Sequence, residues 1–135
     1  MTEQDRSADP GVESSIARPG GVSYLAIPAT DVARSAAFYQ AVFGWELRGD
    51  PGQPSFSDGT GHVIGHWRTD LEPAGEAGVR PYVYVTELAA ALERARAQGA
   101  EVLAEPYAEG SLTIAVVRDP GGSAIGIWTG PLGAA

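Results

Sequence analysis

The sequence contains no cysteine and no lysine, and each absence excludes a kind of chemistry. Without cysteine the chain cannot form a disulfide, a zinc–thiolate site or a thiolate nucleophile. Without lysine it cannot form a Schiff base with a carbonyl substrate. Histidine is scarce as well, with 2 in 135 residues. The range of covalent and metal chemistry open to this chain is therefore narrow.

Positive charge is also in short supply. The 9 basic residues, all arginine, face 17 acidic residues, for a net charge of −8. Binding to nucleic acid needs a basic stripe, so we expect no nucleic-acid partner. The negative field favours a cationic or neutral small molecule, although its simplest effect is solubility.

Long apolar runs are missing too. No segment approaches the roughly 20 apolar residues needed to cross a bilayer, so we expect no membrane partner. The first 21 residues are rich in Ser, Asp, Glu, Pro and Gly and contain no signal-peptide core. We expect residues 1–20 to be a disordered leader, 21–130 a single domain and 131–135 a tail, in a cytoplasmic protein.

A repeat is the most informative feature that is present. The segment Asp-Gly-Thr-Gly-His-Val-Ile-Gly-His-Trp (58–67) aligns without gaps on Asp-Pro-Gly-Gly-Ser-Ala-Ile-Gly-Ile-Trp (119–128). Each copy has the composition of a tight turn that leads into a strand. The chain therefore contains two related halves.

A strand and a helix precede each copy. In the first half, strand 22–28 leads to a helix that Thr30 or Asp31 caps and Gly44 ends. Its apolar face holds Val32, Ala36, Tyr39 and Phe43. In the second half, strand 82–85 leads to a helix that ends at Gly99, with an apolar stripe of Leu88, Leu92 and Ala95.

Three strands follow each helix, at 45–48, 55–57 and 63–68 and again at 101–104, 112–118 and 124–129. We predict an α+β fold of tandem βαβββ modules, module one at 22–68 and module two at 81–130, joined by a linker at 69–80. Neither module buries its sheet alone. The two together are expected to form a cupped, partly closed mixed sheet with the helices outside.

These motifs resemble the vicinal oxygen chelate superfamily, which includes glyoxalases, bleomycin-resistance proteins and extradiol dioxygenases. The resemblance rests on Phe38-Tyr39 with Phe43-Gly44-Trp45, and on Asp119-Pro120-Gly121-Gly122 before Ile125-Gly126-Ile127-Trp128. It covers about residues 22 to 130. It implies the fold and leaves the activity open.

Catalytic members of that superfamily hold a divalent metal with His, Gln or Glu on the first and last strand of each half. The resemblance places Tyr24, Gly65, Tyr82 and Gly126 at these positions. A neutral phenol is a poor ligand and glycine offers none, so we predict no metal and no other cofactor. His62 and His66 lie on a strand, about 13 Å apart, and are expected to face away from the cup.

Strand alternation then predicts what lines the cup. The expected ligand-binding residues are Tyr24, Ala26, Gly65, Trp67, Tyr82, Tyr84, Gly126 and Trp128. Aromatic rings with a hydroxyl or an indole N–H suit a flat ligand with a polar group. The alternative is that these rings simply fill the cup as core.

Two functions are compatible with this lining. One is a metal-independent protein that binds a small aromatic or cationic molecule, as a resistance, sequestration or carrier protein. The other is a metal-free isomerase, cyclase or lyase of secondary metabolism, with Tyr24 and Tyr82 as proton donors or hydrogen-bond anchors. The resemblance also implies a homodimer. The sequence does not identify the ligand, or decide whether the halves are exchanged between chains or whether a reaction takes place.

Overall fold

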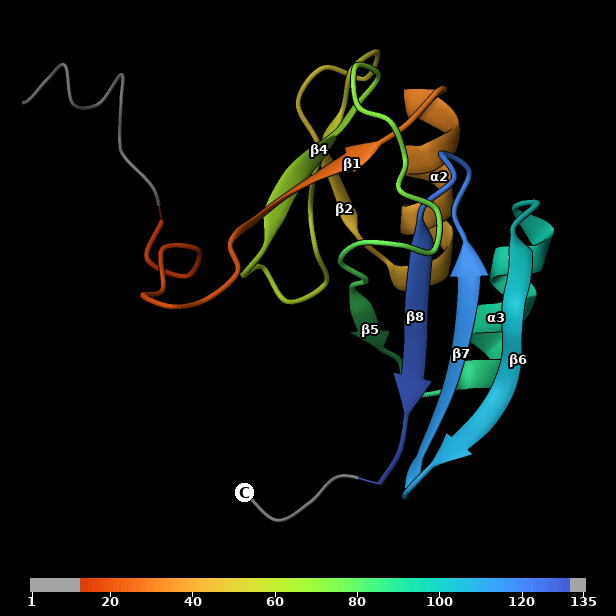
Figure 1. Cartoon of the computed structure of the whole chain (residues 1–135). Helices are drawn as coiled ribbons and strands as arrows, with labels where there is room; N and C mark the ends of the chain where they lie inside the picture. The colour runs from red at the N-terminus through yellow and green to blue at the C-terminus, as the bar shows by residue number, and fades with distance from the viewer. Residues whose placement is uncertain (1–12, 132–135) are drawn as a thin grey trace, which may run out of the picture.

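The computed structural model describes residues 13–131, which form two βαβββ modules in the predicted order (Figure 1). The rest of the expected leader and tail, residues 1–12 and 132–135, lies outside the described residues. Residues 14–16 and 19–20 form turns, and Ile16 is buried. No helix in the described part of the chain is long and apolar enough to cross a membrane.

Each module forms its own four-stranded sheet. Module one contains β1 (Tyr24–Pro28), α2 (Val32–Phe43), β2 (Glu46–Arg48), β3 (Ser55–Ser57) and β4 (Ile64–Arg68), with the strand order β1-β4-β3-β2. Module two contains β5 (Tyr82–Tyr84), α3 (Leu88–Ala97), β6 (Glu101–Glu109), β7 (Leu112–Arg118) and β8 (Ala124–Thr129), in the order β5-β8-β7-β6. In both sheets the first strand pairs in parallel with the last, and the other pairs are antiparallel. The predicted α+β fold is confirmed, with two mixed sheets.

The helix boundaries follow from local chemistry. The Asp31 carboxylate accepts a hydrogen bond from the Arg34 N–H at the start of α2, so Asp31, and not Thr30, is the N-cap. Gly44 ends α2 with a φ of 72°, a left-handed conformation that costs a glycine little. Gly99 follows α3 with a φ of 82°, as the sequence predicted.

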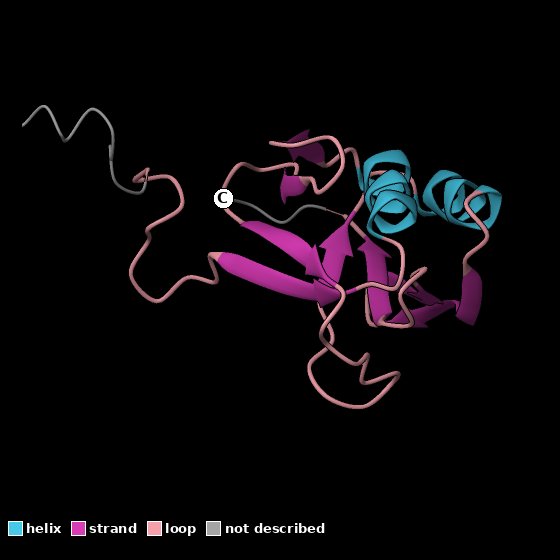
Figure 2. Ribbon diagram, turned by 90° about the horizontal axis from the view of Figure 1, so that it is seen from above, coloured by secondary structure: helices cyan, strands magenta, loops and turns pink. Residues whose placement is uncertain are grey.

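The helices cover one face of each sheet and leave the opposite face open. Both helices lie side by side, with the strands of the two sheets arranged around them (Figure 2). A single core is buried between helices and sheets, and its members come from both modules: Ile27, Phe38, Tyr39, Trp45, Phe56, Trp67, Leu92, Ala115, Val117 and Ile127. We call the face of each sheet that points away from the helices its open face.

A buried hydrogen bond joins the two modules. The Tyr39 hydroxyl on α2 donates to Asp119 Oδ2 in the β7–β8 turn over 2.6 Å, and both residues are buried. Asp119 Oδ1 accepts from the backbone N–H of Gly121 and Ser123. Burial raises the pKa of Asp119 in spite of these donors, and burial together with the Asp119 charge raises that of Tyr39. This contact fixes α2 of module one on the last hairpin of module two.

Candidate functional site

The open face of module two brings four predicted site residues together. β5 and β8 pair so that Tyr82 lies opposite Gly126 and Tyr84 opposite Trp128. The Tyr84 and Trp128 rings meet edge to face, with centroids 4.9 Å apart. Tyr82 lies over Gly126 so closely that a side chain there would collide with its ring. Tyr82 and Tyr84 are 46% and 39% exposed, so this aromatic surface is open to a ligand.

The same surface continues across β7 and β6. Ile114 lies opposite Trp128 and Val116 opposite Gly126, and Tyr107 lies opposite Ile114. We call the group Tyr82, Tyr84, Trp128 and Tyr107 the aromatic platform.

The open face of module one carries two more of the predicted residues, Tyr24 and Ala26, together with a histidine. The Tyr24 hydroxyl is hydrogen bonded to His66 Nδ1, and the two rings meet edge to face. Ala26 lies directly opposite His66 in the parallel pair of β1 and β4. The prediction that His66 faces away from Tyr24 is therefore wrong: a phenol and an imidazole share this face.

An ion pair lies at the end of the same strand. Arg68 Nε and Nη2 donate to the two oxygens of Asp70 over 2.9 and 2.5 Å. The hydrogen bonds that Arg68 donates to Asp70 lower the pKa of the Asp70 carboxyl and raise the pKa of the Arg68 guanidinium.

Gly65 and Trp67 lie on the other face of β4, contrary to the predicted lining. Trp67 is 3% exposed and packs in the core against Tyr39 and Phe56. Its indole Nε1 has no hydrogen-bond partner among the described residues. A side chain on Gly65 would collide with the Leu25 carbonyl oxygen and the Phe56 ring. These two residues therefore belong to the packing between sheet and helix.

One extra turn residue explains this difference. The first hairpin closes with the Asp58 N–H donating to the Val63 carbonyl, and the second with the Asp119 N–H donating to the Ser123 carbonyl. Residues 59–62 stand between the first pair and only 120–122 between the second. Because side chains alternate along a strand, one added residue moves the following strand to the opposite parity. His66, and not Gly65, is thus the counterpart of Gly126.

The predicted correspondence between Tyr24 and Tyr82 on the first strands is also shifted, by two residues. The helix N-caps Asp31 and Glu87 are equivalent, and Tyr24 stands seven residues before Asp31. The residue seven before Glu87 is Arg80, whose Nη1 donates to the Tyr82 hydroxyl over 3.5 Å. Tyr82 corresponds instead to Ala26, since these two lie opposite Gly126 and His66. Alignment through the caps would have revealed this from the sequence.

The donor groups at these positions do not fit the metal that the fold suggests. His66 supplies one imidazole and Tyr24 one phenol, while the counterparts in module two are a glycine and an arginine. No group of three or more His, Cys, Asp or Glu side chains within residues 13–131 is placed to hold an ion. The other histidine, His62, is occupied by the Ser15 carbonyl at 2.8 Å from Nδ1. One imidazole without a carboxylate is too small a donor set for a divalent metal, which prefers several such ligands.

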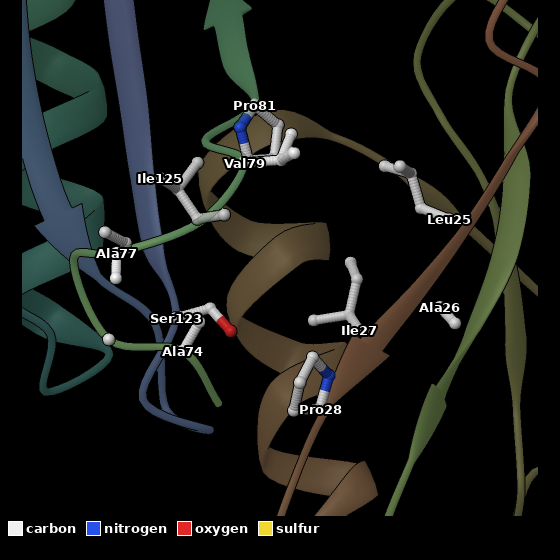
Figure 3. Close-up of a pocket in the computed structure, with 12 residues that line it drawn as sticks. Leu25, Ala26, Ile27, Pro28, Ala74, Ala77, Val79, Pro81, Ser123 and Ile125 are labelled. Carbon is white, nitrogen blue, oxygen red and sulfur yellow. The ribbon is translucent and has the colours of Figure 1, made fainter. Parts of the chain in front are cut away.

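Cavities follow the junction between the modules. A cavity of about 190 Å³ lies between β1, the linker and the start of β8 (Figure 3). Leu25 and Ile27 point into it from β1, whereas Ala26 points the other way, and Val79 and Pro81 face it from the linker. The side chains that line it are apolar except for Ser123.

Comparison with solved structures identifies the fold. A glyoxalase/bleomycin resistance protein/dioxygenase family enzyme from Burkholderia phytofirmans PsJN is 22% identical, with a TM-score of 0.67, over 81% of this chain and 98% of that chain. A glyoxalase-related enzyme from Fulvimarina pelagi is 20% identical, with a TM-score of 0.68, over 85% and 94%. The fosfomycin resistance protein FosX from Listeria monocytogenes is 18% identical, with a TM-score of 0.66, over 84% and 95%.

Comparison with curated proteins gives no match. The glyoxalase-like domain family, by contrast, matches residues 24–127, which span both modules from β1 into β8. The chain therefore belongs to the family of glyoxalase-like domains, within the vicinal oxygen chelate superfamily.

Proposed function

We propose that this protein binds a small aromatic or cationic molecule on the aromatic platform of module two, without a metal or another cofactor. The observation that carries the proposal is the pairing of Tyr84 with Trp128 beside the exposed Tyr82 ring. Aromatic side chains offer large apolar areas in fixed orientations, and a flat ligand stacks on them. The glycine beneath Tyr82 lets that ring lie close to the sheet.

The role we favour is resistance, sequestration or transport of the ligand. One protein of the same fold is a fosfomycin resistance protein, so protection against a small molecule occurs on this scaffold. The negative charge of the chain supports a ligand that is neutral or cationic. The same negative charge disfavours nucleic acid. We also propose that the protein acts in the cytoplasm, where a chain without cysteine needs no disulfide.

We also propose that the working form is a homodimer. Tyr24, Tyr82 and Tyr84 are large rings that remain 50%, 46% and 39% exposed in one chain. A second copy laid on the open faces would cover this apolar area and complete the cup, with Tyr24 and Ala26 contributing to its wall. Sedimentation equilibrium tests this: a monomer at all concentrations contradicts the dimer.

Trp128→Ala tests the binding site. A thermal-shift screen of aromatic and cationic compounds identifies a ligand, since 100 times the Kd adds about 2.7 kcal/mol to stability. We expect Trp128→Ala to remove most of the binding and Trp128→Phe, which keeps a ring, to retain part of it. Unchanged affinity in a folded Trp128→Ala protein would contradict the proposal. Elemental analysis showing stoichiometric metal would contradict its metal-free character.

A second candidate function is a metal-free isomerase, cyclase or lyase. The observation that favours it is the hydrogen bond between Tyr24 and His66, because it puts a base beside the proposed proton donor. Arg80 donates to Tyr82 in a similar way. Turnover that falls about 100-fold or more in Tyr24→Phe, with ligand binding retained, would favour the enzyme. Equal turnover in the two proteins would exclude this role for Tyr24.

A further inference from the structure

A second cavity lies at the junction between the modules and shares Tyr82 with the aromatic platform. Its volume is about 240 Å³, and its wall is made by Val22, Leu25, Ile27, Tyr39, Trp45, Asp58, Val63, Pro81, Tyr82, Val83 and Ile125. An adjoining cavity of about 410 Å³ shares Trp45, Asp58, Tyr82 and Val83 with it. We call the first the central cavity and the second the outer cavity.

Aromatic rings form much of the wall of the central cavity. Trp45 is held rigidly, stacked between Tyr39 at 4.6 Å and Phe56 at 4.7 Å. Tyr82 contributes a partly exposed ring on the other module. Tyr39 and Phe56 cover the faces of the Trp45 ring, so Trp45 and Tyr39 supply apolar wall. The negative ring face that is open to an organic cation is that of the partly exposed Tyr82.

Asp58 is the only charged residue in the wall of either cavity. Its Oδ1 closes the β3–β4 turn, accepting from Thr60 N at 3.1 Å, Thr60 Oγ1 at 2.8 Å and Gly61 N at 3.0 Å. No hydrogen bond from residues 13–131 reaches Oδ2, and the carboxylate takes part in none of the ion pairs of that region. The carboxylate therefore keeps one oxygen free beside an apolar cavity.

The equivalent aspartate in module two makes the difference clear. Asp119 closes its turn with Oδ1 in the same way, but its Oδ2 accepts the Tyr39 hydroxyl. The repeat thus has two similar carboxylates, one satisfied within the protein and one left beside the cavities. A carboxylate at the edge of an apolar space is stabilised by a positive partner.

We infer that the central cavity binds a small organic cation of the alkylammonium class, with Asp58 opposite its charge and Trp45, Tyr39 and Tyr82 around its alkyl groups. A quaternary ammonium group has no N–H donors, so it needs only this charge, the exposed Tyr82 ring and the apolar wall. The net charge of −8 raises the local concentration of such cations. This site differs from the proposed platform site, because it uses Asp58 and Trp45 in place of Tyr84 and Trp128; the two sites have Tyr82 in common.

The test compares choline with 3,3-dimethylbutan-1-ol, its uncharged isostere, on the wild-type protein by titration calorimetry. We expect choline to bind at least about fivefold more tightly, and its affinity to fall as salt is raised. Equal affinity of the two probes, or no binding of choline at millimolar concentration, would overturn the inference. This comparison requires no variant and so does not depend on folding.

Two matched variants locate the charge. Asp58→Asn keeps an oxygen for the turn and is expected to weaken choline binding about fivefold. Asp50→Asn makes the same change in net charge and also keeps a turn oxygen, which the Gly52 N–H uses, but it lines neither cavity. We expect Asp50→Asn to bind choline like the wild type. An equal loss in both variants, or none in Asp58→Asn, would contradict a site at Asp58.

Discussion

The two modules share a topology, yet their open faces carry different chemistry. Across module one, the strand register aligns His66 with Ser55 and Arg48, and Ile64 with Ser57 and Glu46. Across module two, it aligns Trp128 with Ile114 and Tyr84, and Gly126 with Val116 and Tyr82. One face is therefore rich in ionisable and hydroxyl groups, and the other is aromatic and aliphatic. The duplicated fold fixes the positions and leaves the chemistry of each module free to differ.

The faces toward the helices do not differ in this way. Both are apolar and merge into one core that contains Phe56 and Trp67 from module one and Ile125 and Ile127 from module two. Packing constrains this side in both copies, because a polar group buried there costs free energy unless it is paired. The contrast between the modules is thus confined to their open faces.

The two glycines that the sequence alignment pairs provide the strongest test of the contrast. We expect Gly65→Ala to destabilise the fold by about 3 kcal/mol or more, because its Cβ meets the Leu25 backbone. In Gly126→Ala the three atoms nearest the added Cβ all belong to the Tyr82 ring, which is partly exposed and can move, so about 1 kcal/mol is expected. Chemical denaturation of both variants measures the two values. Equal losses of stability would mean that Gly65 and Gly126 lie on the same face of their sheets.

Removal of the hydrogen bond between Tyr39 and Asp119 is expected to have the next largest effect on stability. Tyr39→Phe leaves Asp119 buried with one donor fewer, which should lower the free energy of unfolding by about 2 kcal/mol. Tyr107→Phe removes a hydroxyl from a side chain that is 42% exposed and serves as the matched control, with little change expected. A loss in Tyr39→Phe no greater than in the control would show that the hydrogen bond contributes nothing to the joining of the modules.

The raised pKa of Asp119 predicts that the free energy of unfolding depends on pH. The Asp119 pKa is raised above the ordinary value of 3.8, mainly by burial, so the folded chain holds this proton more tightly than the unfolded chain. The stability from this group is therefore fully present below pH 3.8 and decreases as pH rises through the raised pKa. Asp119→Asn should remove this part of the slope when its unfolding is compared with wild type between pH 3 and about 7. Parallel stability curves would contradict the raised pKa.

The substitution Trp67→Phe should have the smallest effect on the free energy of unfolding. The Trp67 indole N–H is buried without a partner among residues 13–131, so Trp67→Phe removes an unsatisfied donor as well as some apolar area. The two changes oppose each other, and we expect a net change within about 1 kcal/mol. Trp67→Ala, which leaves a cavity, should cost about 3 to 5 kcal/mol and is the comparison. A large loss in Trp67→Phe would indicate that the N–H has a partner.

Most of the fold could be predicted from the sequence because periodicity, caps and glycine stops are local signals. The helix that starts after Asp31 and ends at Gly44 is an example. The predicted strand at 101–104 was too short, because β6 extends to Glu109 through two shifts of register that no local pattern marks.

The candidate site was harder to predict than the fold. On β5 and β8 the predicted parity placed Tyr82, Tyr84, Gly126 and Trp128 on one face, as the structure has them. On β4 a gapless alignment ignored the extra turn residue and assigned Gly65 and Trp67 to the wrong face. The free oxygen of Asp58 had no signal in the sequence, since its repeat partner Asp119 shows the same turn pattern.

The most direct test of the central contrast uses the indole N–H resonances of Trp45, Trp67 and Trp128. These three side chains line the central cavity, fill the core and form part of the platform, respectively. On titration with an aromatic ligand from the thermal-shift screen, we expect the Trp128 signal to move with the binding isotherm and the Trp67 signal to stay in place. Saturable binding that moves Trp67 and leaves Trp128 unchanged would contradict a ligand site on the aromatic face of module two.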